Sequence, residues 1–306
     1  MTEHIFFEMK SAHRDDLRIK AYRFGRGEKT VCIMGALRGN EVQQLYICAR
    51  LIKELKKLEA EGAIMPNNSI AVIPSVNHYS MNIGKRFWSA DNTDINRMFP
   101  GYDKGEVTQR IAAAVFEHIK GYTYGIQFAS FYMPGDFVPH VRMMSTGYQN
   151  SSLANLFGLP YVVLRNPKPY DTTTLNYNWQ LWNTNAFSVY TKETNNIDEE
   201  QANEAVKSVL RFLNRLGIIR CKLHNGYIAT VIQEDELEVV RAEASGFYRR
   251  YKNASDQVSE GELIGEILDP YNCEVRQKVI APRDGVVFFG YHNPLVMEHE
   301  ALFKLL

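Results

Sequence analysis

The stretch VCIMGALRGNE, residues 31–41, carries the strongest structural signal in this sequence. Its first four residues are apolar and predict a buried strand. Glycines then predict a turn, and Glu41 opens a helical pattern that runs to about Leu58. In an open α/β sheet such a turn lies at the carboxyl ends of the strands, where ligands bind. We therefore expect the Glu41 side chain to line a ligand site.

The composition is that of an ordinary globular protein with balanced charge. Of the 306 residues, 45% are hydrophobic and 23% are charged, and 35 basic residues match 35 acidic ones. Without net charge or a basic stripe, we expect neither a nucleic-acid partner nor a membrane partner. No apolar run approaches the roughly 18 residues of a membrane span, and the start of the chain lacks a signal-peptide pattern. The four scattered cysteines predict free thiols, and we expect a cytoplasmic protein.

The order of predicted elements indicates a larger α/β domain followed by a small β-domain. Across residues 1–217, strand-like runs alternate with helical patterns, which favours a mostly parallel sheet flanked by helices. From residue 218 to 306, short strand-like runs are separated by turn residues, which predicts an all-β domain. In the larger domain the predicted helices span residues 42–58, 106–119 and 199–216, and the predicted strands span 5–7, 17–24, 31–34, 69–76, 124–128, 161–164 and 187–191.

Polar segments follow four of the predicted strands, and these segments could carry chemistry. They comprise residues 35–41, 77–101, 125–130 and 190–196. The carboxyl ends of parallel strands share one edge of the sheet. We therefore expect the four segments to converge, although they lie far apart in the sequence.

Each of the four segments also contains a recognisable motif. The motifs are GALRGNE at 35–41, DINRMFPG at 94–101, QFA at 127–129 and TKE at 191–193. In this order they resemble Gly-x-x-His-Gly-Asn-Glu, Asp-Leu-Asn-Arg-x-Phe-Pro-Gly, Asp-Leu-His and Thr-x-Glu of the succinylglutamate desuccinylase/aspartoacylase family. The small β-domain is also similar to the C-terminal domain of that family. The resemblance implies a zinc carboxypeptidase-like fold and, for the family, metal-dependent amide hydrolysis.

The resemblance also shows where this sequence departs from the family at the zinc site. Two histidines and one glutamate hold the family's zinc, which is an open three-ligand pattern. Glu41 matches the glutamate, whereas Arg38 and Ala129 stand at the two histidine positions. Gln127 stands where the third motif has its aspartate. Two of the three metal ligands are therefore replaced.

The remaining site residues of the family have matches in this sequence. By resemblance, Glu193 corresponds to the catalytic general base. Asn96 and Arg97 correspond to the clamp for the substrate carboxylate, and Arg86 corresponds to a further substrate-binding arginine. The residues expected to bind an anion and to act as the base therefore persist.

Physical chemistry argues against the usual zinc mechanism at this site. Arginine keeps its charge and offers only hydrogen-bond donors, so Arg38 cannot ligate zinc. We hypothesise that its guanidinium occupies the metal position and pairs with Glu41 and Glu193, which would otherwise repel each other. We therefore expect no cofactor, a degraded metal site with Glu41 as a vestigial ligand, and a possible pseudoenzyme. The small carboxylate-bearing ligand would contact Arg38, Arg86, Asn96 and Arg97.

An alternative is an active metal-dependent amide hydrolase, such as an N-acyl amino-acid deacylase, with a rearranged zinc site. His78 directly follows the second predicted core strand, and His140 lies downstream of the third motif. These two histidines could complete such a site with Glu41. Simpler roles also remain open, because Glu41 suits any helix N-terminus. Arg97 could tie its loop to the backbone, and Glu193 could be a solvated turn residue. The sequence leaves open whether the chain is an enzyme.

Overall fold

The computed structural model describes residues 1–11, 15–131, 133–192 and 194–306. The chain forms two compact units. The larger comprises Met1–Ala129, His140–Tyr190 and Thr194–Val231, and the smaller comprises Ser130–Pro139, Thr191–Glu193 and Ile232–Leu306. The predicted domains, 1–217 and 218–306, are contiguous stretches, whereas the chain passes between these two units several times.

The larger unit is built on a nine-stranded sheet with the order β1-β2-β4-β3-β5-β9-β7-β8-β10. The central strands β4, β3, β5 and β9 run parallel to one another, and β7 and β8 form a second parallel pair. The predicted α/β class with a mostly parallel sheet is confirmed. The strands are β1 (Thr2–Met9), β2 (Leu17–Gly25), β3 (Glu28–Ala36), β4 (Asn68–Ser75), β5 (Tyr124–Ala129), β7 (His140–Met144), β8 (Tyr161–Arg165), β9 (Asn185–Tyr190) and β10 (Thr230–Gln233).

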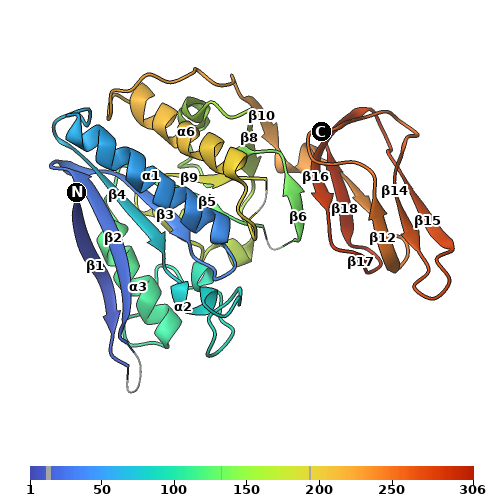
Figure 1. The fold of residues 1–306 in the computed structure, drawn as a ribbon, viewed down its shortest axis with the longest axis horizontal. Coiled ribbons are helices and arrows are strands. Elements are labelled where there is room, and N and C mark those ends of the chain that lie inside the picture. Colours follow the sequence, from blue (N-terminus) through green and yellow to red (C-terminus); the bar gives the residue numbers. More distant parts are fainter. Residues whose placement is uncertain (12–14, 132, 193) are drawn as a thin grey trace. The chain divides into compact units, whose positions relative to one another are not determined.

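Helices cover both faces of this sheet. The two long helices α1 and α6 lie side by side over one face (Figure 1), and residues of α3 and α5 pack on the other. The helices are α1 (Val42–Ala60), α2 (His78–Met81), α3 (Val107–Ile119), α4 (Ser151–Ala154), α5 (Leu175–Leu181) and α6 (Glu199–Arg215). Short 3₁₀ turns are η1 (Ile95–Arg97), η2 (Asn155–Phe157), η3 (Pro169–Asp171) and η4 (Glu234–Glu236).

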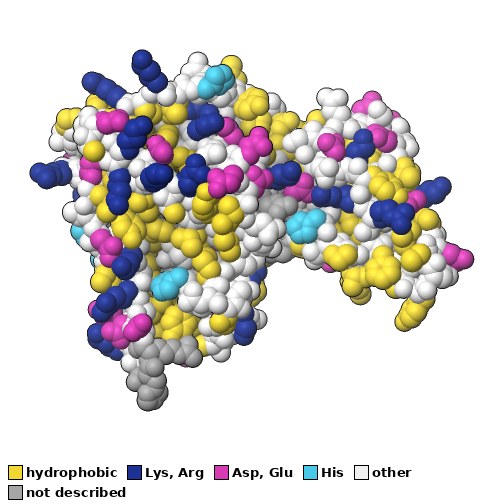
Figure 2. Space-filling view, in the orientation of Figure 1, with side chains coloured by type: hydrophobic (Ala, Val, Ile, Leu, Met, Phe, Trp, Pro, Cys, Tyr) yellow, Lys and Arg dark blue, Asp and Glu magenta, His cyan; other side chains and the backbone are white. Residues whose placement is uncertain are grey.

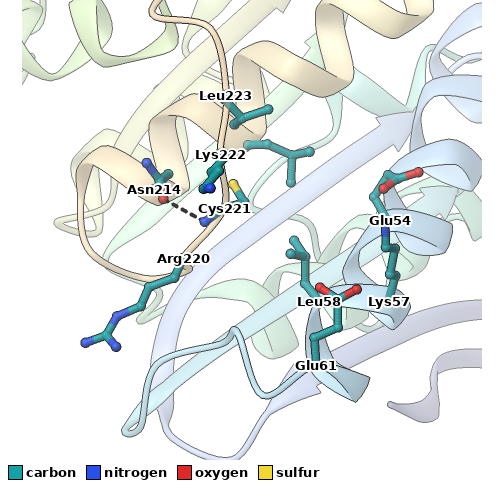
Figure 3. A pocket seen from close by; sticks show the side chains of 10 residues that line it. Glu54, Lys57, Leu58, Glu61, Asn214, Arg220, Cys221, Lys222 and Leu223 are labelled. Atoms are coloured by element: carbon teal, nitrogen blue, oxygen red, sulfur yellow. Dashed lines mark hydrogen bonds between the residues drawn. The ribbon is translucent and has the colours of Figure 1, made fainter.

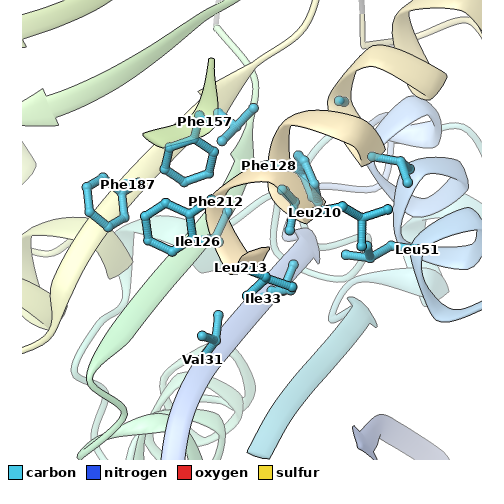
Figure 4. Close-up of a cluster of buried hydrophobic side chains, with 14 of the residues drawn as sticks. Val31, Ile33, Leu51, Ile126, Phe128, Phe157, Phe187, Leu210, Phe212 and Leu213 are labelled. Carbon is cyan, nitrogen blue, oxygen red and sulfur yellow. The ribbon is translucent and has the colours of Figure 1, made fainter. Parts of the chain in front are cut away.

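The apolar run of β3 explains why this strand lies at the centre. Because side chains alternate along a strand, Val31 and Ile33 join the core beneath α1 and α6, which is drawn in Figure 4. Cys32 and Met34 join the core on the opposite face. All four side chains are fully buried. A strand that is apolar on both faces is typical of a sheet covered on both sides.

The smaller unit consists of antiparallel strands, as the sequence predicted. One sheet has the order β11-β18-β16-β13, with β6 also paired to β16, and the other has the order β15-β14-β12-β17. The strands are β6 (Gly135–Phe137), β11 (Glu238–Arg241), β12 (Gly246–Arg250), β13 (Gln257–Val258), β14 (Leu263–Leu268), β15 (Val275–Ile280), β16 (Gly285–Tyr291), β17 (Leu295–Val296) and β18 (Ala301–Leu305).

The surface reflects the balanced composition. On the face of the larger unit shown in Figure 2, Lys and Arg side chains intermingle with Asp and Glu side chains. In the described part of the chain, no helix combines the length and the apolar character needed to cross a bilayer. The four cysteines, Cys32, Cys48, Cys221 and Cys273, are free thiols.

Candidate functional site

Glu41 is held in place by the turn between β3 and α1. It is the N-cap residue of α1, and it is 1% exposed. Its Oε2 accepts hydrogen bonds from the backbone N–H groups of Leu37 (2.9 Å) and Arg38 (3.0 Å). Its Oε1 accepts a bond from Nη1 of the Arg38 side chain at 3.2 Å. Both carboxylate oxygens therefore already accept hydrogen bonds from N–H groups.

Arg38 joins the first motif segment to the second. Its Nε donates to both carboxylate oxygens of Asp94 (3.2 and 3.1 Å), and its Nη2 donates to Asp94 Oδ2 at 2.8 Å. Arg38 is only 7% exposed. Burial by itself would lower the pKa of Arg38, but the charges of Glu41 and Asp94 outweigh burial and raise this pKa. The guanidinium is therefore a permanent cation fixed between two carboxylates.

The hypothesis for Arg38 named Glu41 and Glu193 as its partners. The structure pairs Arg38 with Glu41, and it adds Asp94, which the hypothesis did not include. Asp94 also accepts the backbone N–H of Asn96 at 3.0 Å, and so starts the η1 turn. Glu193 lies outside the described residues.

Gly39 allows the loop that carries Arg86 to approach the turn after β3. The Gly39 N–H donates to the carbonyl of Arg86 at 2.8 Å. A Cβ atom at residue 39 would lie 2.2 Å from the carbonyl oxygen of Lys85, so a side chain cannot fit there. Burial, with Arg38 nearby, lowers the pKa of Arg86. Arg86 also donates to the Asn40 side chain at 3.4 Å.

Asn96 and Gln127 connect the second motif segment to the end of β5. Gln127 Nε2 donates to Asn96 Oδ1 at 3.4 Å, and the same oxygen accepts the backbone N–H of Leu175 at 3.4 Å. Gln127 is 3% exposed and Asn96 is 8% exposed. Ala129, two residues after Gln127 on the same face of β5, presents only a methyl group, and its carbonyl accepts a bond from Gln44 Nε2 at 3.1 Å.

Arg97 is more exposed than Arg38 or Asn96. More than a third of its side chain is exposed. Its Nη1 donates to the Tyr170 carbonyl at 2.9 Å, and the guanidinium lies 5.2 Å from the centre of the Tyr170 ring. Arg165 and Lys168 also lie near this ring. Arg97 thus ties its loop to the backbone, and its side chain stays partly exposed.

The residues that follow Glu193 are bound to the start of α1. The Gln43 N–H donates to the Thr194 carbonyl at 3.2 Å, and Asn40 Nδ2 donates to Asn195 Oδ1 at 2.9 Å. Contacts therefore link parts of the first, second and third motif segments, and link the first to residues 194 and 195 of the fourth.

The two histidines of the alternative metal site lie on separate elements. His78 is the first residue of α2, and burial lowers its pKa. His140 begins β7, is 1% exposed and stacks on Tyr190 with 4.9 Å between ring centres. Within the described ranges, no group of three or more His, Cys, Asp or Glu side chains is arranged to hold a metal ion.

A pocket of about 600 Å³ lies away from all these residues (Figure 3). Its lining comes from the second half of α1, the end of α6 and residues 220–223. Glu54, the first of its residues along α1, is roughly 20 Å from Glu41 along the helix axis at 1.5 Å per residue. This pocket contains none of the predicted site residues.

Sequence reasoning missed two charged residues of this region. Asp94 was noted in its segment but was given no role, although the 3₁₀ turn that it caps is signalled by Asp before Ile-Asn-Arg. Arg142 lies on β7, which the sequence analysis did not predict. In the sheet Arg142 is opposite Ser188, which is itself opposite Gln127, so the three residues form one row across β7, β9 and β5.

Several solved structures share this fold. The product-bound structure of the ectoine utilization protein EutE (DoeB) from Ruegeria pomeroyi matches with a TM-score of 0.81 and 17% identity, over 99% of this chain and 94% of that one. An aspartoacylase family protein from Mesorhizobium loti matches at 0.78 and 20%, over 97% and 91%. A succinylglutamate desuccinylase/aspartoacylase from Rhodobacter sphaeroides matches at 0.78 and 18%, over 95% and 89%. At these identities the similarity establishes the fold.

The comparison with family models identifies the family. Among curated proteins, none matches this chain. Residues 27–216 match the model of the succinylglutamate desuccinylase/aspartoacylase catalytic domain. The match covers more than half of the chain and includes the segments that carry all four motifs. This protein therefore belongs to the succinylglutamate desuccinylase/aspartoacylase family.

Proposed function

We propose that this family member binds a small carboxylate-bearing molecule and does not use the zinc-dependent hydrolysis of its family. One observation carries the proposal: the Arg38 guanidinium is buried between Glu41 and Asp94, at the sequence position of a zinc-binding histidine. A permanent cation at this place takes over the charge balance that a divalent ion would otherwise supply.

The donor set of the described residues does not fit a catalytic zinc ion. Zinc requires lone pairs from nitrogen, oxygen or sulfur atoms. Arg38 offers only N–H donors, Ala129 offers a methyl group, and both oxygens of Glu41 already accept N–H groups. A metal bound to Glu41 alone would be held weakly and without defined geometry.

Loss of the metal would also remove the means of activating water. Water bound to zinc has a pKa of about 7, against about 16 in bulk. A carboxylate base such as Glu193 cannot bridge that difference by itself, so we infer that amide hydrolysis by the family route is absent.

The anion-binding residues are retained, which supports a ligand with a carboxylate. Arg97 follows Asn96 in the η1 turn, and the charges of Arg38 and Arg97 both act on Arg86, so the three arginines lie near one another. Part of this charge is balanced by Glu41 and Asp94. We propose that the remaining charge, together with the Asn96 amide, binds the ligand carboxylate. Because all four cysteines are free thiols, we also propose a cytoplasmic location.

Metal titration tests the proposal directly. The parent protein and an Arg38→His/Ala129→His double variant are titrated with Zn²⁺, followed by elemental analysis after dialysis. We expect one tightly bound zinc per chain only in the double variant, because it regains the two imidazole ligands. Stoichiometric zinc bound to the parent through Glu41 would overturn the proposal. The single variants are the matched controls, since each restores only one ligand.

An activity assay separates the proposal from the alternative of a rearranged metal site. The parent is assayed for hydrolysis of N-acyl amino acids with added Zn²⁺, Mn²⁺ or Co²⁺. We expect no turnover above the uncatalysed rate. Turnover that a chelator abolishes, and that His78→Ala or His140→Ala reduces, would instead support an amide hydrolase with a relocated site.

A further inference from the structure

The orientation of the Asn96 side chain is fixed by two donors. Its Oδ1 accepts the backbone N–H of Leu175 and the Nε2–H of Gln127, each at 3.4 Å. A backbone N–H can only donate, so the contact with Leu175 identifies the oxygen end of the carboxamide. The amide nitrogen must then point the other way.

The Asn96 amide nitrogen is available to a ligand. Within residues 1–11, 15–131, 133–192 and 194–306, no acceptor is hydrogen-bonded to Asn96 Nδ2, and the residue is 8% exposed. We propose that Gln127 is a positioning residue, which holds Asn96 so that Nδ2 faces the bound anion. This inference rests on the proposed binding of an anionic ligand, and it assigns a role to a residue that does not itself contact that ligand.

The residue type at position 127 determines whether Asn96 Oδ1 receives a hydrogen bond from that side chain. A glutamine supplies the N–H that Asn96 Oδ1 requires. An ionised carboxylate at the same place only accepts hydrogen bonds, so it would repel Oδ1 and attract Nδ2. Only the Leu175 N–H would then still favour the present orientation, so a larger share of the molecules would turn the carboxamide oxygen towards the ligand, where it repels an anion. The aspartate of the resembling motif could not act as Gln127 does here.

Gln127 is well placed for a positioning role because the sheet fixes its backbone. It is paired with Met34 of β3 on one side and with Ser188 of β9 on the other. Its side chain is buried on the same face of the sheet as Ala129. A buried amide that donates to another buried amide is costly to leave unpaired.

The test is a Gln127→Glu variant. Its carboxyl can donate a hydrogen bond to Asn96 Oδ1 when it is protonated, and it cannot donate when it is ionised. The probe is ethane-1,2-disulfonate, which stays doubly ionised throughout the range from about pH 5 to pH 8.5. Burial raises the pKa of an introduced glutamate, so residue 127 would be a neutral donor at the low end and an acceptor at the high end. We expect binding within about twofold of wild type near pH 5, and roughly tenfold weaker binding near pH 8.5.

The pH profile separates positioning from a merely structural role. Other charged groups of the region are present in both proteins, so only the difference between the two profiles is read; these groups are Arg38, Glu41, Arg86, Asp94, Arg97 and Arg142. Gln44→Glu is the matched control, since Gln44 is also fully buried but donates to the Ala129 carbonyl and not to Asn96. A Gln127→Glu profile parallel to that of wild type, or a Gln44→Glu profile with the same loss, would overturn the inference.

Nuclear magnetic resonance on the wild-type protein keeps the inference testable if Gln127→Glu fails to fold. The Asn96 side-chain N–H₂ signals are assigned by their loss in Asn96→Asp. We expect ethane-1,2-disulfonate to shift these signals more than those of Gln127, because Asn96 contacts the anion and Gln127 does not. Binding that shifts the Gln127 signals and leaves those of Asn96 unmoved would refute the inference. Absence of any binding would contradict the proposed function, while amide signals of Gln127 that exchange rapidly with solvent would refute its bond to Asn96.

Discussion

The partners of Arg38 show which contacts the sequence can predict and which only the fold reveals. The sequence identifies the residue as a cation at a metal-ligand position and names Glu41 as a partner. It does not identify Asp94, because that partner lies 56 positions away and reaches Arg38 only through the fold. The same limit applies to Gln127 and Asn96, which are separated by 31 positions.

Removal of the Arg38 charge should destabilise the protein in a pH-dependent manner. Arg38→Met would leave Glu41 and Asp94 close together and without their shared cation, and breaking such a buried pair costs roughly 3–5 kcal/mol. The two negative charges would repel each other in the folded variant, whereas the unfolded chain keeps them apart. The variant would therefore lose stability as the pH rises, and regain part of it in mild acid, where a carboxyl takes up a proton.

Urea unfolding at about pH 5 and pH 8 measures this effect. Arg97→Met is the control, because Arg97 also lies near Asp94, at 3.7 Å, but its side chain is more than a third exposed. We expect that control to lose less than about 1 kcal/mol at either pH. An Arg38→Met variant as stable as wild type at pH 8 would show that the two carboxylates do not depend on this guanidinium.

At the scale of elements, the prediction succeeded where periodicity is strong. The apolar run of β3 and the helical patterns of α1, α3 and α6 were identified, with boundaries within a few residues. The strand β7 (HVRMM) was missed because it is short, because a proline precedes it, and because two of its buried residues, His140 and Arg142, are polar. The short helix α5 (LNYNWQL) was missed because it has fewer than two full turns of pattern. Trp179 of α5 is fully buried, so tertiary packing stabilises this helix where its local helix propensity is weak.

The contact between the β3–α1 turn and the Arg86 loop should depend on Gly39. Gly39→Ala would force a Cβ against the backbone of residues 80, 81 and 85, and we expect a loss of roughly 1–3 kcal/mol because backbone cannot move aside as a flexible side chain would. Gly84→Ala is the control in the same loop. It has open space around its Cβ but a φ of +64°, so its cost is limited to backbone strain of about 1 kcal/mol. Thermal unfolding of both variants gives the comparison, and an equal loss in the two would contradict the steric argument.

At the scale of the whole molecule, the chain itself connects the site to the smaller unit. β5 ends at Ala129, and the following segment Ser130–Pro139 belongs to the smaller unit, where β6 pairs with β16. Phe137 of β6 is 3% exposed and lies against Phe289 of β16. Asp136 pairs with Arg250 and accepts the Ala254 N–H at 3.2 Å. The sequence predicted a separate β-domain. It could not reveal that this domain includes β6, which lies between the third and fourth motif segments, because pairing between strands about 150 residues apart leaves no local sequence pattern.

Because β6 belongs to the smaller unit but lies before residue 231, we predict that the larger unit will not behave as an independent domain. A fragment ending at Val231 would leave Phe137 without the ring of Phe289 and Asp136 without Arg250, so a buried apolar strand and a buried carboxylate would become exposed together. We expect the fragment to melt well below the full-length protein and to aggregate, and co-expression with residues 232–306 to restore a soluble complex with a melting temperature close to that of the full chain. Differential scanning calorimetry with size-exclusion chromatography measures both. Asp136→Asn in the full-length chain is the matched test of the ion pair alone, and it should lower stability by less than the truncation does, because the β6–β16 pairing remains. A monodisperse fragment with the melting temperature of the full chain would mean that the segment after β5 finds its fold without the smaller unit.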